Sequence, residues 1–128
     1  MMQNPELLRK IMLAAERQPA GKPMTGTDLK GCCDDPHELG DHVQQLIEAG
    51  YVDGVVHINP GLTPKIRLNR LTFHGHEFLH AMRDDSIWKM VKEKVMLPTA
   101  SWSLKLAAAY AIKLAATHLG LPGVPPHS

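Results

Sequence analysis

Apolar side chains near the start of the chain recur at intervals of three and four residues, a pattern that predicts an amphipathic helix over residues 5–17. Asn4 and Pro5 suit the cap and the first turn of this helix. Two prolines and a glycine interrupt the pattern between residues 18 and 23. Residues 24–33 fit either an extended strand or a single helical turn.

A second helix is predicted over residues 36–49, because Asp35 can cap its start and Gly50 can end it. Glu38 stands three residues after Asp35, as in a capping box. The apolar stripe that this helix should bury consists of Leu39, Val43, Leu46 and Ile47.

Alternating apolar and polar residues then predict a β-hairpin with strands over residues 51–58 and 65–71. The sequence between them, Asn-Pro-Gly-Leu-Thr-Pro, is typical of a turn. Ile66 and Leu68 of the returning strand should face the core. The residues expected to face outward are Lys65, Arg67 and Asn69.

Helices are predicted for most of the remaining chain. Thr72 can cap one helix, Asp84 or Asp85 can cap its continuation, and Pro98 stops that continuation. An alanine-rich helix should run from about residue 99 to 119. Its large apolar side chains are spread around its circumference, so it must be buried against something, and a domain of this size can bury one face of it.

These elements predict an α+β fold that is mostly α. We expect one domain over residues 1–98, then a helix over residues 99–119 that packs on this domain or on a second subunit, and a frayed tail over residues 120–128.

The 14 Lys and Arg residues nearly balance the 13 Asp and Glu residues, so the net charge of +1 gives no long-range attraction for polyanions. No uninterrupted apolar stretch suits a signal peptide or a membrane span, and we expect a cytoplasmic protein.

The order helix, connector, helix, hairpin, helix resembles the winged-helix superfamily. Two motifs carry this resemblance. The second helix closes on Leu46-Ile-Glu-Ala-Gly-Tyr-Val52, and the helix after the hairpin opens on Leu71-Thr-Phe-His-Gly75. The resemblance implies a winged-helix-like domain with a helical extension at its C-terminal end.

A closer resemblance is to the family of the domain of unknown function 2513, found in bacteria and prophages. The similar segments are residues 7–13, 46–54, 70–79 and 83–88. The resemblance covers most of residues 4–120, and it implies a winged-helix-like fold and an association with phages or mobile elements. It supplies no known activity or catalytic residue. Members usually carry an acid at the position of His80.

His76, Glu77 and His80 match the H-E-x-x-H pattern, in which two histidines one helical turn apart bind zinc and the glutamate acts as a base. A zinc hydrolase also needs a third protein ligand, and no residue continues the known longer patterns. We therefore interpret the match as accidental and expect neither a metal nor another cofactor, with a metal-binding protein of the H-E-x-x-H type as the remote alternative. Adjacent Cys32 and Cys33 suit neither a mutual disulfide nor zinc chelation, so we expect reduced thiols.

One functional hypothesis is weak DNA binding. In DNA-binding winged helices the second helix enters the major groove and the wing contacts the backbone. Gln44 and Gln45 could read base edges there. The backbone contacts would come from Lys65, Arg67 and Arg70. The carboxylates of the same helix oppose this hypothesis, because they would repel phosphate.

The favoured hypothesis is a non-enzymatic regulatory or adaptor protein that binds a protein partner. The acidic helix would supply one contact, through Glu38, Asp41 and Glu48. The last helix would supply another, through Trp102, Leu106 and Tyr110. The last helix could also form a homodimer, or it could dock on the core of its own chain.

Overall fold

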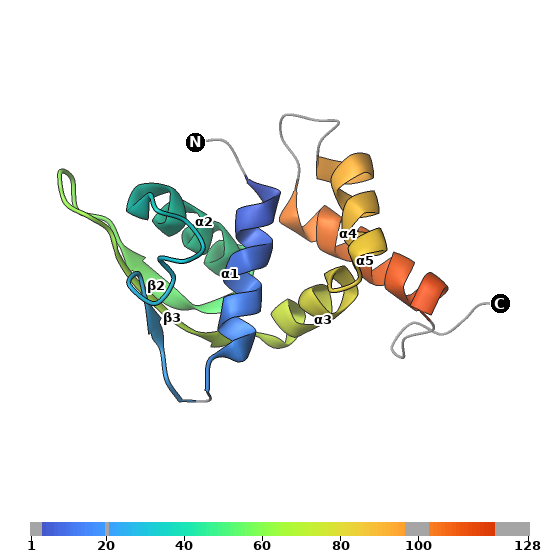
Figure 1. Ribbon diagram of the computed structural model, residues 1–128, viewed down its shortest axis with the longest axis horizontal. Helices are drawn as coiled ribbons and strands as arrows, with labels where there is room; N and C mark the ends of the chain where they lie inside the picture. The colour runs from blue at the N-terminus through green and yellow to red at the C-terminus, as the bar shows by residue number, and fades with distance from the viewer. Residues whose placement is uncertain (1–3, 20, 97–102, 120–128) are drawn as a thin grey trace. The chain divides into compact units, whose positions relative to one another are not determined.

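The computed structural model describes residues 4–19, 21–96 and 103–119, which form a mostly helical α+β fold, as predicted (Figure 1). The chain divides into two compact units, residues 1–76 and 77–128. The first unit contains α1 (Pro5–Arg17), β1 (Met24–Thr25), α2 (Pro36–Glu48), β2 (Val52–His57), β3 (Lys65–Leu71) and the start of α3 (Phe73–Met82). The second contains the rest of α3, then α4 (Asp85–Val91), the π-helical η1 (Lys92–Met96) and α5 (Leu104–Leu119).

Local capping explains where the first two helices begin. The Asn4 side chain accepts a hydrogen bond from the Leu7 N–H at 3.3 Å, and the Asp35 carboxylate accepts one from the His37 N–H at 2.9 Å. These bonds satisfy backbone donors that the first turn of a helix leaves without a partner. Glu38 does not complete a capping box in the structure. Its carboxylate accepts a long hydrogen bond from the Cys33 thiol at 3.6 Å.

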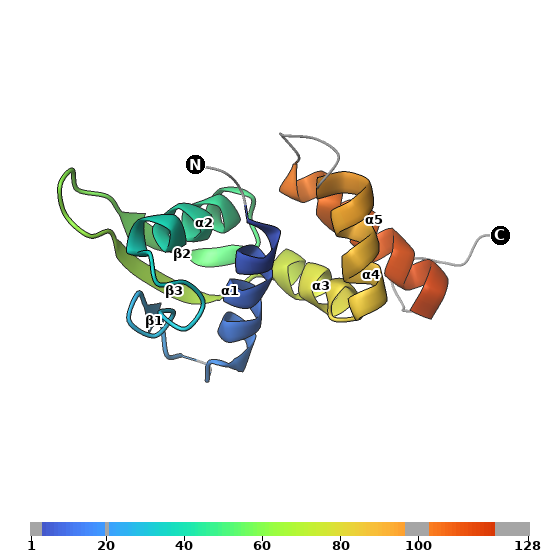
Figure 2. The same cartoon turned by 45° about the horizontal axis from the view of Figure 1, so that its top comes forward.

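The sheet is antiparallel with the strand order β1-β3-β2 (Figure 2). Only Met24 and Thr25 of the ambiguous segment form a strand, where Met24 pairs with Leu68. Gly54 pairs with Leu68 and Asp53 with Arg70, so Asn69 is an extra residue on β3. Such a bulge resets the alternation of side chains along a strand.

Helices α1 and α2 pack against each other and against the sheet. Leu39, Val43 and Leu46 of the predicted stripe are buried, whereas Ile47 is only half-buried. His42 joins this stripe instead, with no exposed surface. The other core side chains of the first unit include Leu7, Leu8, Ile11, Met12, Leu29, Val52, Ile66, Leu68 and Leu71.

The two motifs that resemble winged helices contact each other in the structure. The Thr72 hydroxyl donates to the Gly50 carbonyl at 2.6 Å, and the Thr72 N–H donates to the Tyr51 carbonyl at 3.1 Å. Thr72 also caps α3, because its hydroxyl accepts from the Gly75 N–H at 3.1 Å. A Cβ atom on Gly75 would collide with the Tyr51 carbonyl. We call this set of contacts the Thr72 clasp.

In the second unit, α5 packs against α4 and η1. Its buried face is made of small residues after the initial Leu104, namely Ala107, Ala108, Ala111 and Ala115. Leu106 is 61% exposed. This exposure leaves Leu106 accessible for the protein contact expected of it, and that contact stays a prediction. Residues 97–102, which include Pro98, Trp102 and the expected domain boundary, lie outside the described residues, as do the expected tail residues 120–128.

Candidate functional site

The polar side chains of α2 form one continuous face of the helix, and three of them are carboxylates. The members of this face occur at helical spacing and are His37, Glu38, Asp41, Gln44, Gln45 and Glu48. They lie opposite the buried stripe and are exposed or half-buried. The sequence of α2 contains no Lys or Arg. We call this set the α2 acidic face.

Both glutamines of this face are bonded to its carboxylates. The Gln45 amide donates to Asp41 Oδ2 at 3.1 Å, and the Gln44 amide donates to Glu48 Oε2 at 3.3 Å. A base edge would have to displace these carboxylate acceptors before the glutamine amides could read it. The two residues predicted to read DNA therefore lie within an acidic network.

The predicted basic residues Lys65, Arg67 and Arg70 are all exposed on β3. Lys65 and Arg67 alternate with the buried residues Ile66 and Leu68, so they point away from the side on which α1 and α2 pack. Arg70 would face inward under strict alternation, and the bulge at Asn69 turns it outward. The basic set and the α2 acidic face thus belong to different faces of the first unit.

The two arginines have polar neighbours on the outer face of the sheet. Arg67 Nε donates to Asn69 Oδ1 at 3.2 Å. Arg70 Nε lies 3.8 Å from Asp53 Oδ2, and these side chains are 68% and 54% exposed. An exposed ion pair of this length is weak, so Arg70 can exchange Asp53 for another anion.

His76, Glu77 and His80 of the H-E-x-x-H pattern lie on α3 and are exposed. Across residues 4–19, 21–96 and 103–119, no group of three or more His, Cys, Asp and Glu side chains is placed to hold a metal ion. The structure therefore brings no third ligand to this histidine pair from the described part of the chain. The absence of a metal from the working protein stays a prediction.

Cys32 and Cys33 are free thiols and partly exposed. Burial raises the pKa of the Cys32 thiol, an effect that Lys10 and Arg17 partly oppose. Burial also raises the pKa of the Cys33 thiol, and the nearby Glu38 carboxylate adds to this shift. Both thiols are thereby kept in the protonated form, which is the poorer nucleophile.

Sequence reasoning missed the role of His42, although its spacing from Leu39 and Leu46 fits the buried stripe. Its Nε2 accepts from the Asn4 N–H at 2.9 Å, and its Nδ1 lies 2.8 Å from the Glu38 carbonyl oxygen. A carbonyl only accepts and an amide N–H only donates, so Nδ1 carries the ring proton. His42 is a structural link between α1 and α2.

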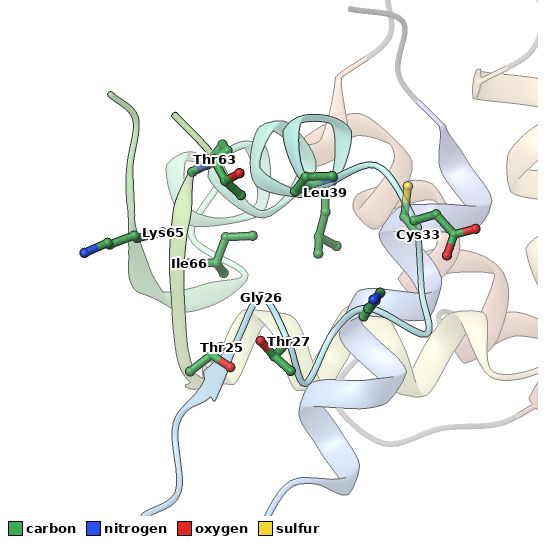
Figure 3. A pocket seen from close by; sticks show the side chains of 12 residues that line it. Thr25, Gly26, Thr27, Cys33, Leu39, Thr63, Lys65 and Ile66 are labelled. Carbon is green, nitrogen blue, oxygen red and sulfur yellow. The ribbon is translucent and has the colours of Figure 1, made fainter. Parts of the chain in front are cut away.

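A pocket of about 630 Å³ opens at the N-terminal end of α2 (Figure 3). Leu39 and Ile66 project into it, and buried Pro64 adds to its apolar lining. Hydroxyl groups come from Thr25, Thr27 and Thr63. The volume is in the range of sites that accept a small molecule or an anchoring side chain. We call it the α2 pocket. No local sequence signal marks it, because its lining comes from three separate segments.

No helix within the described residues has the length and apolarity needed to cross a membrane. No curated protein and no solved structure matches the chain significantly. Its assignment to the winged-helix superfamily therefore stays a prediction. The model of one family, described as hypothetical protein DUF2513, matches residues 2–101. That match spans most of the chain and includes helices α1 to α4, η1, the sheet and the Thr72 clasp, so the chain belongs to the DUF2513 family.

Proposed function

We propose that this chain is a non-enzymatic regulatory or adaptor module that binds a protein partner through the α2 acidic face. The observation that carries this proposal is the composition of that face, which has three carboxylates and no Lys or Arg. A surface of one charge favours a partner of opposite charge and rejects a partner of the same charge. The partner segment should therefore be basic.

The α2 pocket supports a protein partner because it offers an anchor site beside this face. Binding energy in protein interfaces concentrates in a few apolar or aromatic side chains that fill pockets, surrounded by polar contacts that add selectivity. Leu39 belongs both to α2 and to the wall of the pocket. One partner segment with an apolar anchor followed by basic residues would use both features.

Affinity capture with charge-reversal variants tests this proposal. The wild-type chain should retain a protein partner that Asp41→Lys and Glu48→Lys each lose, because a new ammonium group repels a basic segment. Glu93→Lys is the matched control, since Glu93 is an exposed acid on η1. The same retained proteins with all four baits would contradict the proposal.

A second candidate function is weak duplex binding through the outer face of β3. The specific observation that favours it is the exposure of Lys65, Arg67 and Arg70 on one strand. These residues would contact phosphates, so binding should be independent of sequence and steeply dependent on salt. Arg67→Ala combined with Arg70→Ala should weaken binding to every duplex and lower the salt slope by about one for each lost contact. Binding that is insensitive to both arginines would contradict this candidate.

A further inference from the structure

Phe73 is an exposed aromatic residue beside a groove. It is 73% exposed, whereas the only other phenylalanine, Phe78, is 1% exposed. Phe73 follows Thr72, so the Thr72 clasp fixes the backbone that presents the ring. The groove has a volume of about 700 Å³, and its floor includes the buried residues Ala15 and Leu71.

The groove is also basic on the side formed by β3. Arg67, Arg70 and His76 line it together with Phe73, while Glu16 is its one acidic lining residue. The bulge at Asn69 matters here, because it turns Arg70 to the side that carries Arg67. The exposed Asp53–Arg70 pair is weak enough for a phosphate to replace Asp53.

An aromatic ring next to guanidinium groups suits one ligand chemistry, a planar base joined to a phosphate. Bases stack on aromatic side chains and on guanidinium planes, and the phosphate accepts paired hydrogen bonds from arginine. A base can stack on Phe73 only when it is unpaired. The groove is open, and β3 continues from it to exposed Lys65, which provides a path for the backbone of a longer strand.

We propose that this groove binds an unpaired nucleotide of a single-stranded nucleic acid, with the base on Phe73 and the backbone phosphate at Arg67 and Arg70. This site shares its arginines with the duplex-binding candidate but not with the α2 acidic face. The proposal also predicts that single strands bind more tightly than duplexes. Phosphate contacts alone do not give this preference, because it arises from the free base that only a single strand offers to Phe73.

Fluorescence anisotropy of the full chain with a labelled oligo-dT, and with a duplex of the same length, tests the proposal. Single strand should bind at least tenfold more tightly than duplex at about 50 mM salt. Phe73→Ala and Phe73→Leu should each weaken single-strand binding by about five- to hundredfold, while Phe73→Trp should preserve it. Arg67→Ala should lower the salt slope by about 0.7 for one lost phosphate contact.

Leu62→Ala is the matched control, because Leu62 is an exposed apolar residue in the hairpin turn and should not alter binding. Thermal melts verify that each variant is folded, and Phe73 is exposed enough for its variants to fold. Equal binding by wild type and Phe73→Ala, or equal affinity for duplex, would overturn the proposal. Competition by a mononucleotide as strong as that by the oligonucleotide would overturn the assignment to a polymer. Asp41→Lys separates this site from the proposed protein site, because it should abolish partner capture and retain the Phe73 dependence.

Discussion

At the residue scale, His42 shows how a buried polar side chain is compensated. Both ring nitrogens are bonded to backbone groups, one at the start of α1 and one within α2. Burying a polar group costs little folding free energy when all its hydrogen-bond partners are present. A polar group that loses its partner and is shielded from water costs its full desolvation free energy. His42 therefore orients two helices relative to each other in a way that an apolar residue of similar size would not.

His42→Leu should lower the free energy of unfolding by about 1–3 kcal/mol, because the Asn4 N–H would lose its acceptor and the Glu38 carbonyl would lose its imidazole donor. Urea denaturation measures the change. His57→Leu is the matched control, since His57 is exposed on β2 and its replacement should stay within about 0.5 kcal/mol. Equal stabilities of the two variants would contradict the role of His42.

The two thiols give a prediction about pH. Their raised pKa values mean that the folded state favours the neutral form, so this stabilisation is full below the ordinary thiol pKa of 9.0 and is lost as pH rises through the raised value. Alkylation by iodoacetamide should therefore reach half its maximal rate above pH 9.0 in each of Cys32→Ser and Cys33→Ser. The same variants in urea serve as the control, and they should titrate at the ordinary value. A midpoint below neutral pH would indicate an activated thiol and contradict this account.

At the element scale, the Thr72 clasp explains why the two sequence motifs occur together. One motif supplies the carbonyls of Gly50 and Tyr51, and the other supplies the hydroxyl of Thr72 and the space at Gly75. The clasp fixes the end of α2, the end of β3 and the first turn of α3. A motif that looks like a local signal for the end or the start of a helix therefore also forms a tertiary contact.

Gly75→Ala should destabilise the protein by about 1–3 kcal/mol, because the added methyl group meets the Tyr51 backbone, which cannot move aside. This loss should exceed the gain of up to about 1 kcal/mol that alanine brings to a helix. Gly31→Ala is the matched control, as its Cβ would meet no atom within 4 Å. Thermal or chemical denaturation measures the change in stability of each variant. A Gly75→Ala protein that is more stable than the wild type would contradict the close approach of Gly75 to the Tyr51 carbonyl.

The elements also show what local sequence reasoning can predict. The bounds of α1 and β3 were predictable, because caps and periodicity lie within each segment. The pairing of Met24 with Leu68 was not, since it joins positions far apart in the sequence through backbone groups. The outward turn of Arg70 depends on the bulge at Asn69. Gly54 on the partner strand stands at this bulge, but its role is visible only once β2 and β3 are paired, because a Cβ atom there would meet the Arg67 carbonyl. The alanine face of α5 was missed because small side chains look neutral in an apolar pattern.

At the scale of the whole molecule the net charge is close to zero, yet within the first unit the carboxylates of α2 and the cations of β3 lie on different faces. The first unit carries carboxylates on α2 and cations on the outer side of β3. The overall balance of 14 basic and 13 acidic residues gives no indication of this separation. It appears only when α2 and β3 are placed against each other. This separation is the basis for proposing that α2 meets a basic protein segment, while any nucleic acid meets the other face.

The most direct test of this claim is a titration of labelled random and fixed-sequence duplexes with the wild type, Gln44→Ala and Asp41→Lys at about 50 mM salt, where phosphate contacts are weakly screened. The account predicts no sequence-selective complex for the wild type and no effect of Gln44→Ala. Asp41→Lys should leave any weak duplex binding nearly unchanged, because Asp41 lies on α2 and the basic residues of β3 lie on another face of the first unit. A tight, sequence-selective wild-type complex that Gln44→Ala abolishes would show that α2 reads DNA and would contradict the account.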